Sequence, residues 1–437
     1  MAGEWIEQSF ADLVGGKQNV IGGPFGSNLT SAHYAESGVP VVRGSNMSRA
    51  GRYLGDDFAY VSDLKAKELK TNQIAAGDLV VTQRGTLGQV SIAPETGPSR
   101  YVVSQSQMGV HVTSANRLFV FYLLKSPAFD EFLDGAAIQT GVPHINLGLL
   151  RQWRVKAPSR FEQDAIASLL GALDDKIELS QRMAQTVETM ALALFKNWFV
   201  DFEPVRRKAD GRSLGLPQHV EALFPASLSE DGLPAGWGMQ AVGEMFEVSG
   251  GNTPSTTEPD NWNGSHQWAT PKDLSSLISP VLLQTERQIS DAGLARSTSG
   301  LLPKGSLLLS SRAPIGYMAF ATSPVAINQG FAGLVRRKVS TVYAWAWCAA
   351  HMEMIRGNAG GSTFPEISKS VLRNLTMLRP SDAVLTAFET ASEPLVSRMI
   401  AAVEEAATLA DLRDALLPRL ISGELRIRDA ENAVAAA

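Results

Sequence analysis

The chain is poor in the residues that build disulfides and thiolate metal sites. It contains a single cysteine, Cys348, among 437 residues. One cysteine can form neither an intrachain disulfide nor a zinc site made of several thiolates. This composition favours a reducing compartment, and we expect a cytoplasmic protein.

Long hydrophobic runs are also missing. The longest apolar stretch, residues 342–350, is much shorter than the roughly 20 residues that span a bilayer. The first residues include Glu4, Glu7 and Asp12 and contain no apolar segment, so we expect no signal peptide. The pattern argues against any role in a membrane.

Sequence signatures of catalysis are scarce. The chain has no P-loop lysine motif for nucleotide phosphates, and no Asn-Pro-Pro-aromatic or Asp-Pro-Pro-aromatic tetrapeptide of the kind found in amino-methyltransferases. The six histidines are scattered, with no pair at metal-ligand spacing. We therefore expect no enzyme active site, no metal site and no cofactor in this chain.

An excess of positive charge is absent as well. The formal net charge is −5 at pH 7. Proteins that bind nucleic acids usually carry a basic patch or stripe. Any contact with DNA must therefore come from local groups rather than from the overall charge.

What the chain does contain is an internal repeat. Residues 77–88 are echoed by residues 305–316, which lie 228 positions later. Residues 143–158 are echoed by residues 365–380, which lie 222 positions later. A chain of two similar halves is suited to recognising something that itself has two parts.

Each copy begins with a globular segment. In the first copy, residues 39–42, 78–82, 90–93 and 102–112 are rich in β-branched residues and predict strands between Gly, Asn and Ser turns. Residues 116–136 have the spacing of a helix. We therefore expect α+β domains of mixed α/β structure.

Each copy ends in a long helical pattern. From Phe161 to about Phe199, and again from about Ala383 to Ile421, apolar or small residues recur at spacings of three and four. Each helix would be about 60 Å long and needs a partner for its apolar stripe. We expect the two helices to pack antiparallel, coiled-coil-like, with pseudo-two-fold symmetry; the alternative is that each packs on its own globular unit. The first stripe comprises Ile166, Leu170, Leu173, Ile177, Ser180, Ala184, Val187, Ala191, Leu194 and Trp198.

These patterns predict the division of the chain. An Ala-rich tail after Arg428 is expected to fray. The expected parts are a first domain (1–158), a central long helix (159–205), a linker (206–236), a second domain (237–380), a second long helix (381–428) and a tail (429–437).

Several motifs are long enough to indicate a family. They are residues 23–27, 38–44 and 82–88 in the first half, 236–274, 311–316 and 327–331 in the second, and the helical segments 173–179, 198–205 and 416–425. Together they resemble the specificity subunit of Type I restriction-modification enzymes, over nearly the whole chain and in the family's order. Each globular unit looks like a target-recognition domain.

The resemblance implies a function without catalysis. Each recognition domain would read one half of a bipartite site in double-stranded DNA, and the helices would set the gap and dock two methyltransferase subunits. Those subunits would carry S-adenosylmethionine and methylate adenine. Two restriction subunits, which use ATP and magnesium, would join where the system has them.

Loop side chains with donors and acceptors are the candidates for DNA contact, because base edges need both and phosphates need cations. Residues shared by the two copies cannot easily distinguish different half-sites, so they are at least as suited to supporting a loop or holding a phosphate. Contacts that read sequence should lie where the copies differ. The candidates are Arg43, Ser45, Asn46, Arg84, Thr86 and Gln105 in the first domain and Lys272, Arg312, Asn328 and Gln329 in the second.

Candidates for partner docking lie on the first long helix and at its end. Asp174 and Asp175 lie off the apolar stripe, where a solvated face is an equally good interpretation. Trp198, Phe199 and Phe202 are better candidates, and their alternative role is a cap under the first domain. A protein-interaction scaffold without DNA is the rival function, and the negative net charge suits it slightly better.

Overall fold

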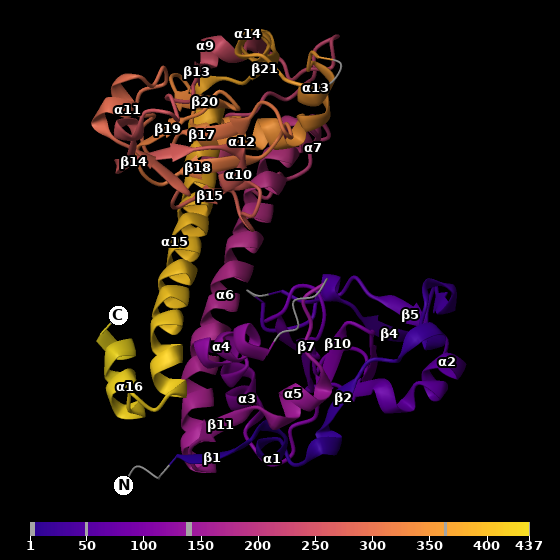
Figure 1. Cartoon of the computed structure of the whole chain (residues 1–437). Helices are drawn as coiled ribbons and strands as arrows, with labels where there is room; N and C mark the ends of the chain where they lie inside the picture. Colours follow the sequence, from indigo (N-terminus) through magenta and orange to yellow (C-terminus); the bar gives the residue numbers. More distant parts are fainter. Residues whose placement is uncertain (1–4, 49–50, 137–141, 362–364, 437) are drawn as a thin grey trace. The chain divides into compact units, whose positions relative to one another are not determined.

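The computed structural model describes residues 5–48, 51–136, 142–361 and 365–436. The chain forms two compact units. The first comprises Met1–Ile177 together with Thr408–Ala437, and the second comprises Glu178–Ala407. Each unit contains one mixed α/β domain and parts of both long helices (Figure 1).

The first unit contains short strands followed by helices, as the alternating apolar segments predict. Its strands are β1 (Ile6–Ser9), β2 (Val20–Gly22), β3 (Tyr34–Ala35), β4 (Val39–Val42), β5 (Ala59–Val61), β6 (Gln73–Ala75), β7 (Leu79–Thr82), β8 (Val90–Ile92), β9 (Arg100–Val103), β10 (Gln107–Val110) and β11 (Arg154–Ala157). Its helices are α1 (Phe10–Leu13), α2 (Asp63–Glu68), α3 (Arg117–Leu123), α4 (Pro127–Ala136), α5 (Leu147–Gln152), the start of α6 (Arg160–Phe199), the end of α15 (Asp382–Ile421), and α16 (Ile427–Ala436).

The strands of the first unit form two main sheets and a small pair. One sheet has the order β2-β10-β7-β8, the other β3-β5-β4-β9-β6, and β1 pairs with β11. The pairing of β4 with β9 is parallel, so the carboxyl ends of these strands meet at one edge. The main core of this unit packs Phe10, Phe119, Phe129 and Leu420 among other buried side chains.

Two of the predicted elements are divided in the structure. The segment 102–112 was expected as one strand, but a turn at residues 104–106 separates β9 from β10, and the two strands belong to different sheets. The helix expected over 116–136 breaks into α3 and α4 just before Pro127, because proline cannot donate the hydrogen bond that continues a helix.

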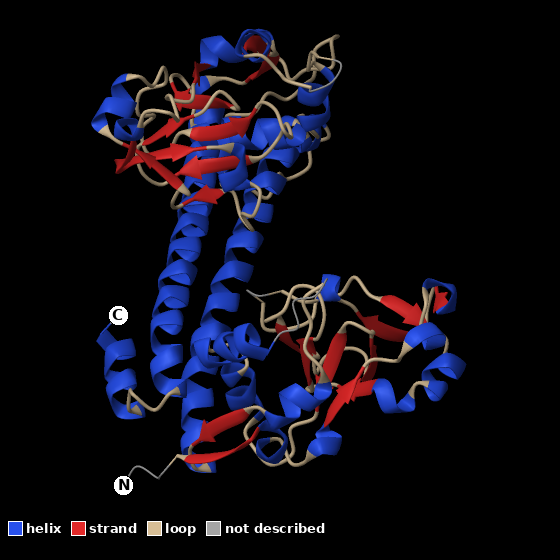
Figure 2. Cartoon of the chain, viewed as in Figure 1, coloured by secondary structure: helices blue, strands red, loops and turns tan. Residues whose placement is uncertain are grey.

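The second unit repeats this plan. Figure 2 shows its strands in red between covering helices. Its strands are β12 (Gly238–Ala241), β13 (Phe246–Gly250), β14 (Trp262–Ala269), β15 (Val281–Leu282), β16 (Arg287–Ile289), β17 (Leu307–Ser310), β18 (Met318–Ala321), β19 (Val325–Ile327), β20 (Phe331–Arg336) and β21 (Thr376–Arg379). Its helices include α7 (Glu203–Ala209), α8 (Gln218–Glu221), α9 (Val242–Met245), α10 (Pro271–Leu274), α11 (Asp291–Ala295), α12 (Thr341–Ala350), α13 (Met352–Gly357) and α14 (Lys369–Asn374).

The pairing of the second unit matches the first over the central strands of each sheet. The order β13-β20-β17-β18 corresponds to β2-β10-β7-β8, with β15 added at the edge. The order β16-β14-β19 corresponds to β5-β4-β9, which in the first unit lies between β3 and β6. The pair β14–β19 is parallel, like β4–β9. The repeat seen in the sequence is therefore a repeat of the fold, and the expected α+β class is confirmed.

The two long helices pack antiparallel, as expected. Within the second unit, Ser180 Oγ on α6 donates a hydrogen bond of 2.9 Å to Glu405 Oε2 on α15. Further along α6, the ring of Phe199 lies 5.1 Å from that of Phe388 on α15. Residue numbers rise along α6 while those of the contacted residues fall along α15. Eight of the ten stripe residues are buried, whereas Val187 and Leu194 are only partly buried. The helix also buries Ala167, Phe195 and Phe199, which lie outside the predicted stripe.

The C-terminal tail and the segment expected as a linker are more ordered than the sequence suggested. The tail after Arg428 was expected to fray, but it forms α16, with Ala430 fully buried in the core of the first unit. Residues 206–236, expected as a linker, contain part of α7 and all of α8 and bury Phe224 against Trp198 in the second unit. In both segments, buried apolar side chains offset the entropy of ordering the chain. Among the described residues, we find no helix with the length and apolar character needed to cross a membrane.

Candidate nucleic-acid interface

In the first unit, loops that are far apart in the sequence converge at the end of the parallel strands β4 and β9. Ser104 N donates to Val42 O at 3.0 Å, which ties the loop after β9 to the end of β4. Gln83 N donates to Ser106 O at 2.8 Å, and Ile145 N donates to Gln83 O at 3.0 Å. We call this surface the first loop edge; it comprises residues 23–29, 43–47, 83–88, 104–106 and 143–146.

Every candidate that the sequence suggested in the first domain lies on the first loop edge. Ser45, Arg84 and Thr86 are exposed there, whereas Asn46 is only 3% exposed. The side chain of Asn46 accepts a hydrogen bond from Arg43 N at 2.9 Å and donates one to Asp57 O at 2.7 Å. Asn46 therefore shapes the turn, and the turn presents Ser45.

Gln105 holds a neighbouring loop through two side-chain hydrogen bonds. Its Nε2 atom donates to Gly26 O at 2.5 Å and to Leu29 O at 3.1 Å. Both bonds hold the loop that follows β2. This geometry favours the supporting role that the repeat suggested for the glutamine shared by both copies.

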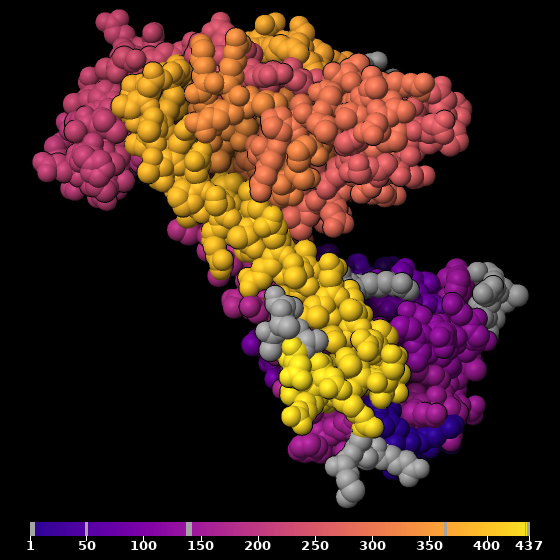
Figure 3. Space-filling model, turned by 90° about the vertical axis from the view of Figure 1, so that its left-hand side faces the viewer, coloured from indigo at the N-terminus to yellow at the C-terminus, as the bar shows by residue number. Residues whose placement is uncertain are grey.

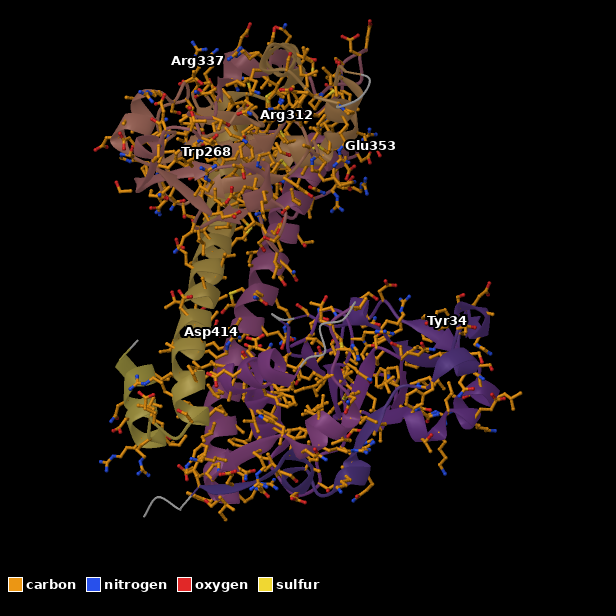
Figure 4. The ribbon with its side chains drawn as sticks, in the orientation of Figure 1. Tyr34, Trp268, Arg312, Arg337, Glu353 and Asp414 are labelled. Carbon is orange, nitrogen blue, oxygen red and sulfur yellow. The ribbon has the colours of Figure 1, made fainter. Side chains whose placement is uncertain are left out.

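The second unit has an equivalent surface, the second loop edge, formed by residues 251–258, 270–274, 311–316, 328–330 and 365–369. Asn328 N donates to Ala269 O at 3.0 Å, and Ser311 N donates to Gly330 O at 2.7 Å. Figure 4 labels Arg312 on this edge. The edge also carries the other candidates of the second domain, Lys272, Asn328 and Gln329.

The second loop edge carries cations that are paired with carboxylates. Lys272 Nζ lies 2.8 Å from Glu286 Oε2, a contact that raises the pKa of this exposed lysine. Arg312 Nη1 lies 3.5 Å from Glu366 Oε2. Lys369 donates to Gln329 O at 2.8 Å, and burial lowers the pKa of Lys369. In the first domain, His144 rather than a carboxylate pairs with Arg84 through the backbone, at the position where Glu366 pairs with Arg312.

The turn that follows β4 in the first domain has the same hydrogen bond as the turn that follows β14 in the second. In the second domain, Asp273 Oδ2 accepts a hydrogen bond from Thr270 N at 2.7 Å, as Asn46 Oδ1 does from Arg43 N. Because the two turns share this bond, Ser45 and Lys272 occupy equivalent positions. Both residues are exposed, and each directly precedes the residue that accepts the hydrogen bond of the turn, Asn46 or Asp273. Because they differ between the domains, they suit the contact with different sequences that the repeat predicts.

A family model decides what this repeated architecture is. The model for the Type I restriction modification DNA specificity domain matches residues 25–189 and again residues 234–382. The chain belongs to this family. The two matches cover both domains and part of α6, so the repeat is a repeat of the specificity domain.

Relatives within the family extend over most of the chain. The HindI specificity subunit of Haemophilus influenzae is 24% identical over 424 residues, which cover 86% of this chain and 92% of the relative. The MjaIX specificity subunit of Methanocaldococcus jannaschii is 24% identical over 385 residues, covering 86% and 84%. Among solved structures, the S subunit of a Type I restriction-modification system from M. genitalium shares the fold, with a TM-score of 0.57, 14% identity and 96% of both chains covered.

The docking candidates on α6 have contacts inside the specificity chain. Asp174 Oδ2 accepts a hydrogen bond from the Tyr122 hydroxyl at 2.6 Å, and Asp174 Oδ1 accepts one from Arg413 at 2.7 Å. Hydrogen bonds to Asp174 and Asp414 outweigh the desolvation of Arg413, so its pKa is raised. Asp175 is largely exposed and pairs with Arg52.

The aromatic residues at the end of α6 belong to the core of the second unit. Trp198 is 2% exposed and Phe199 is 4% exposed. The ring of Phe202 lies 6.2 Å from that of Trp237. The alternative of a cap under the first domain is therefore wrong, because these rings pack with the second domain; of the three, only Phe202 keeps a partly open surface.

Two exposed residues, one on the first loop edge and one on β16, were missed by the sequence reasoning. Phe25 is 80% exposed on the first loop edge. Arg287 stacks over Trp262, with its guanidinium carbon 3.4 Å from the ring centroid. The Trp262 ring in turn lies 5.0 Å from that of Trp268, which Figure 4 labels. The only advance signal was position, since Phe25 lies within a glycine-rich family motif.

The described residues hold no group of three or more His, Cys, Asp or Glu placed to bind a metal. Cys348 is fully buried, and burial raises the pKa of its thiol to about 12. A thiol in this state is a poor nucleophile at neutral pH.

Proposed function

We propose that this chain is the non-catalytic, DNA-reading subunit of a Type I restriction-modification complex, and that each loop edge reads one half of a bipartite site in double-stranded DNA. The observation that carries the proposal is the pair of loop edges, which share a scaffold but differ in exposed side chains. Ser45 stands where the second domain has Lys272. Equivalent scaffolds with different side chains suit two half-sites of different sequence.

The chemistry of the loop edges suits DNA. Their exposed side chains include hydroxyl groups that can donate and accept, and arginine and lysine groups that can pair with phosphates or guanine. Gln105 and Gln329 hold loops in place, which supports a rigid reading surface. The names of the relatives, which are specificity subunits, support the same role.

The two long helices are proposed to dock two methyltransferase subunits and to fix the gap between half-sites. Figure 3 shows a face of α15 open to solvent, as a docking surface must be. The methyltransferase subunits would supply S-adenosylmethionine chemistry at adenine. Two restriction subunits using ATP and magnesium would join in systems that have them.

Mapping of adenine methylation tests the proposal. The chain would be expressed with its methyltransferase partner in a host that lacks other adenine methyltransferases. The expected result is one new methylated motif with two specific halves and a fixed gap. Absence of new methylation from a complex that assembles would support the rival function, a scaffold that does not contact DNA, to which the net charge of −5 gives some support.

A further inference from the structure

Phe25 is an apolar side chain that the fold leaves in solvent. It is 80% exposed. Burying a phenylalanine stabilises a protein or complex by about 2 kcal/mol, so a ring held in water gains from a partner. Single exposed apolar residues are common on protein surfaces, and the position of Phe25 is therefore what gives it meaning.

The turn that carries Phe25 lies against the other loops of the first loop edge. A Cβ atom on Gly23 would lie 1.9 Å from Ser104 O, so only glycine allows this close approach. Ser106 lies two residues after Ser104, and its carbonyl oxygen accepts a hydrogen bond from Arg84 N at 3.2 Å. The Phe25 turn and the Arg84 loop thus flank the same connection between β9 and β10.

The turn is also held rigidly. Gln105 Nε2 bonds to Gly26 O and Leu29 O on one side, and Asn72 Nδ2 donates to Gly22 O at 2.7 Å on the other. Asn28 N closes the tip by donating to Phe25 O at 3.2 Å. A side chain on a fixed backbone loses little entropy on binding, which is what a preorganised recognition residue requires.

The second domain has an equivalent glycine contact, but residues 254–256 do not form the 3-10 turn that residues 26–28 form after Phe25. A Cβ atom on Gly251 would lie 1.7 Å from Ile327 O, so this glycine makes an equally close approach. The residue two positions later is Thr253, whose hydroxyl donates to Gln329 Oε1 at 2.7 Å. The glutamine shared by both copies therefore contacts the loop in both domains, while the residue two positions after the glycine is an aromatic ring in one domain and a threonine in the other.

We propose that Phe25 contacts the apolar surface of a base in the half-site that the first domain reads, and that it is a specificity-determining residue of that domain. The inference rests on the function proposed above. Phenylalanine recognises DNA through the methyl group of thymine or by inserting between base steps. Thr253 offers only a single methyl group beside its hydroxyl, so the large apolar contact of the ring distinguishes the two halves.

The test compares two exposed aromatic residues of the first domain in the complex reconstituted with its methyltransferase. The substitution Phe25→Ala removes the ring at the loop edge. The control Tyr34→Ala removes a ring that is 37% exposed on β3, which pairs through Val61 level with the start of β4 and so lies away from the loop edge. We expect Phe25→Ala to weaken binding to the mapped site by about tenfold, and Tyr34→Ala to leave it unchanged. Phe25→Thr, which installs the residue of the second domain, should behave like Phe25→Ala.

Modified DNA separates the two kinds of base contact. If the ring touches a thymine methyl group, deoxyuridine in place of thymine in the first half-site weakens wild-type binding and does not weaken Phe25→Ala further. If the ring inserts between bases, 2-aminopurine in that half-site brightens on binding the wild-type complex and not the variant. Either result supports the proposal, and failure of both overturns it.

Two further outcomes would also overturn the proposal. One is unchanged affinity and unchanged motif for Phe25→Ala. The other is loss of methyltransferase assembly in that variant, which would make Phe25 a protein contact. Both differ from failure of the proposed function itself, in which the wild-type complex would bind no bipartite site.

Discussion

Arg151 on α5 donates a hydrogen bond of 2.6 Å to the carbonyl oxygen of Val20 on β2. The second domain contains the same bond, from Arg373 to Val248 O at 2.5 Å. Both arginines therefore tie the last helix of a domain to the first strand of its main sheet. Both arginines lie in the segments that revealed the repeat in the sequence, 143–158 and 365–380, and we call each of these two hydrogen bonds a clasp.

Removing either clasp should destabilise only its own domain. Arg151→Met leaves Val20 O without its charged hydrogen-bond donor, and Arg373→Met does the same to Val248 O. Each substitution should lower the free energy of unfolding by about 1 to 3 kcal/mol. Hydrogen exchange should rise in β2 for the first variant and in β13 for the second. Arg100→Met is the control: it removes an exposed pair with Asp63 and should cost under about 1 kcal/mol. Equal exchange throughout the chain in both clasp variants would contradict this account.

Asp174 should be far more important to stability than its neighbour Asp175. The Asp174 side chain is 10% exposed and joins Tyr122 on α3 to Arg413 on α15. Asp174→Ala removes one of the carboxylates that balance the buried charge of Arg413. We expect the free energy of unfolding, measured in urea, to fall by about 3 kcal/mol. Asp175→Ala, at a site where the carboxylate is 68% exposed, is the matched control and should lose under about 1 kcal/mol. Similar losses for the two variants would show that the buried network is not what holds α3 to the helices.

Glu188 should make the second unit less stable as the pH rises. Burial against the domain raises the pKa of its carboxyl to about 7, from an ordinary value of 4.5. A raised pKa in the folded state means that the stabilising contribution is complete below pH 4.5 and is lost as the pH passes through 7. Glu188→Gln should therefore stabilise the protein at pH 8, by roughly 1 kcal/mol after allowing for solvent screening.

Urea unfolding at pH 5 and pH 8 checks this prediction. The increase in the free energy of unfolding caused by Glu188→Gln should be larger at pH 8 than at pH 5. Glu230→Gln makes the same charge change at an exposed position and should show no such difference. A pH-independent effect of Glu188→Gln would mean that the carboxyl is solvated in the folded protein.

The equivalent turn residues Ser45 and Lys272 should each affect one half-site. Ser45→Lys adds a cation to the first loop edge and should steepen the salt dependence of binding by about one phosphate contact. Lys272→Ser should reduce that dependence by a similar amount. Titration of the assembled complex with its mapped site at several salt concentrations measures both slopes, and unchanged slopes would place these residues away from the DNA.

The sequence predicted the parts of the fold that rest on periodicity. The apolar stripes predicted both long helices and favoured their antiparallel packing, which contacts within the second unit confirm. The ends of α6 also pack into the domain cores, as the alternative interpretation allowed. The break between β9 and β10 was missed, although four consecutive polar residues, 104–107, lie at that point. The turn depends on hydrogen bonds to distant loops, which the local pattern does not show. The tail was misjudged for a similar reason: the burial of Ala430 depends on tertiary contacts.

The candidate residues were predicted more accurately as positions than as roles. All ten DNA candidates lie on the two loop edges, because loops at strand ends were the right place to search. Which of them support loops was visible only in the contacts of Asn46 and Gln105. Phe25 escaped notice because a search for donors and acceptors passes over an apolar ring.

The central claim is that each loop edge reads its own half of a bipartite site. The most direct measurement is adenine methylation mapping of complexes in which the exposed residues of one edge are changed, with Ser45→Lys for the first and Lys272→Ser for the second. The account predicts that each variant alters or relaxes bases in one half of the motif, that the two variants affect opposite halves, and that the gap stays constant. Changes in both halves from one substitution, or a shift in the gap, would contradict it.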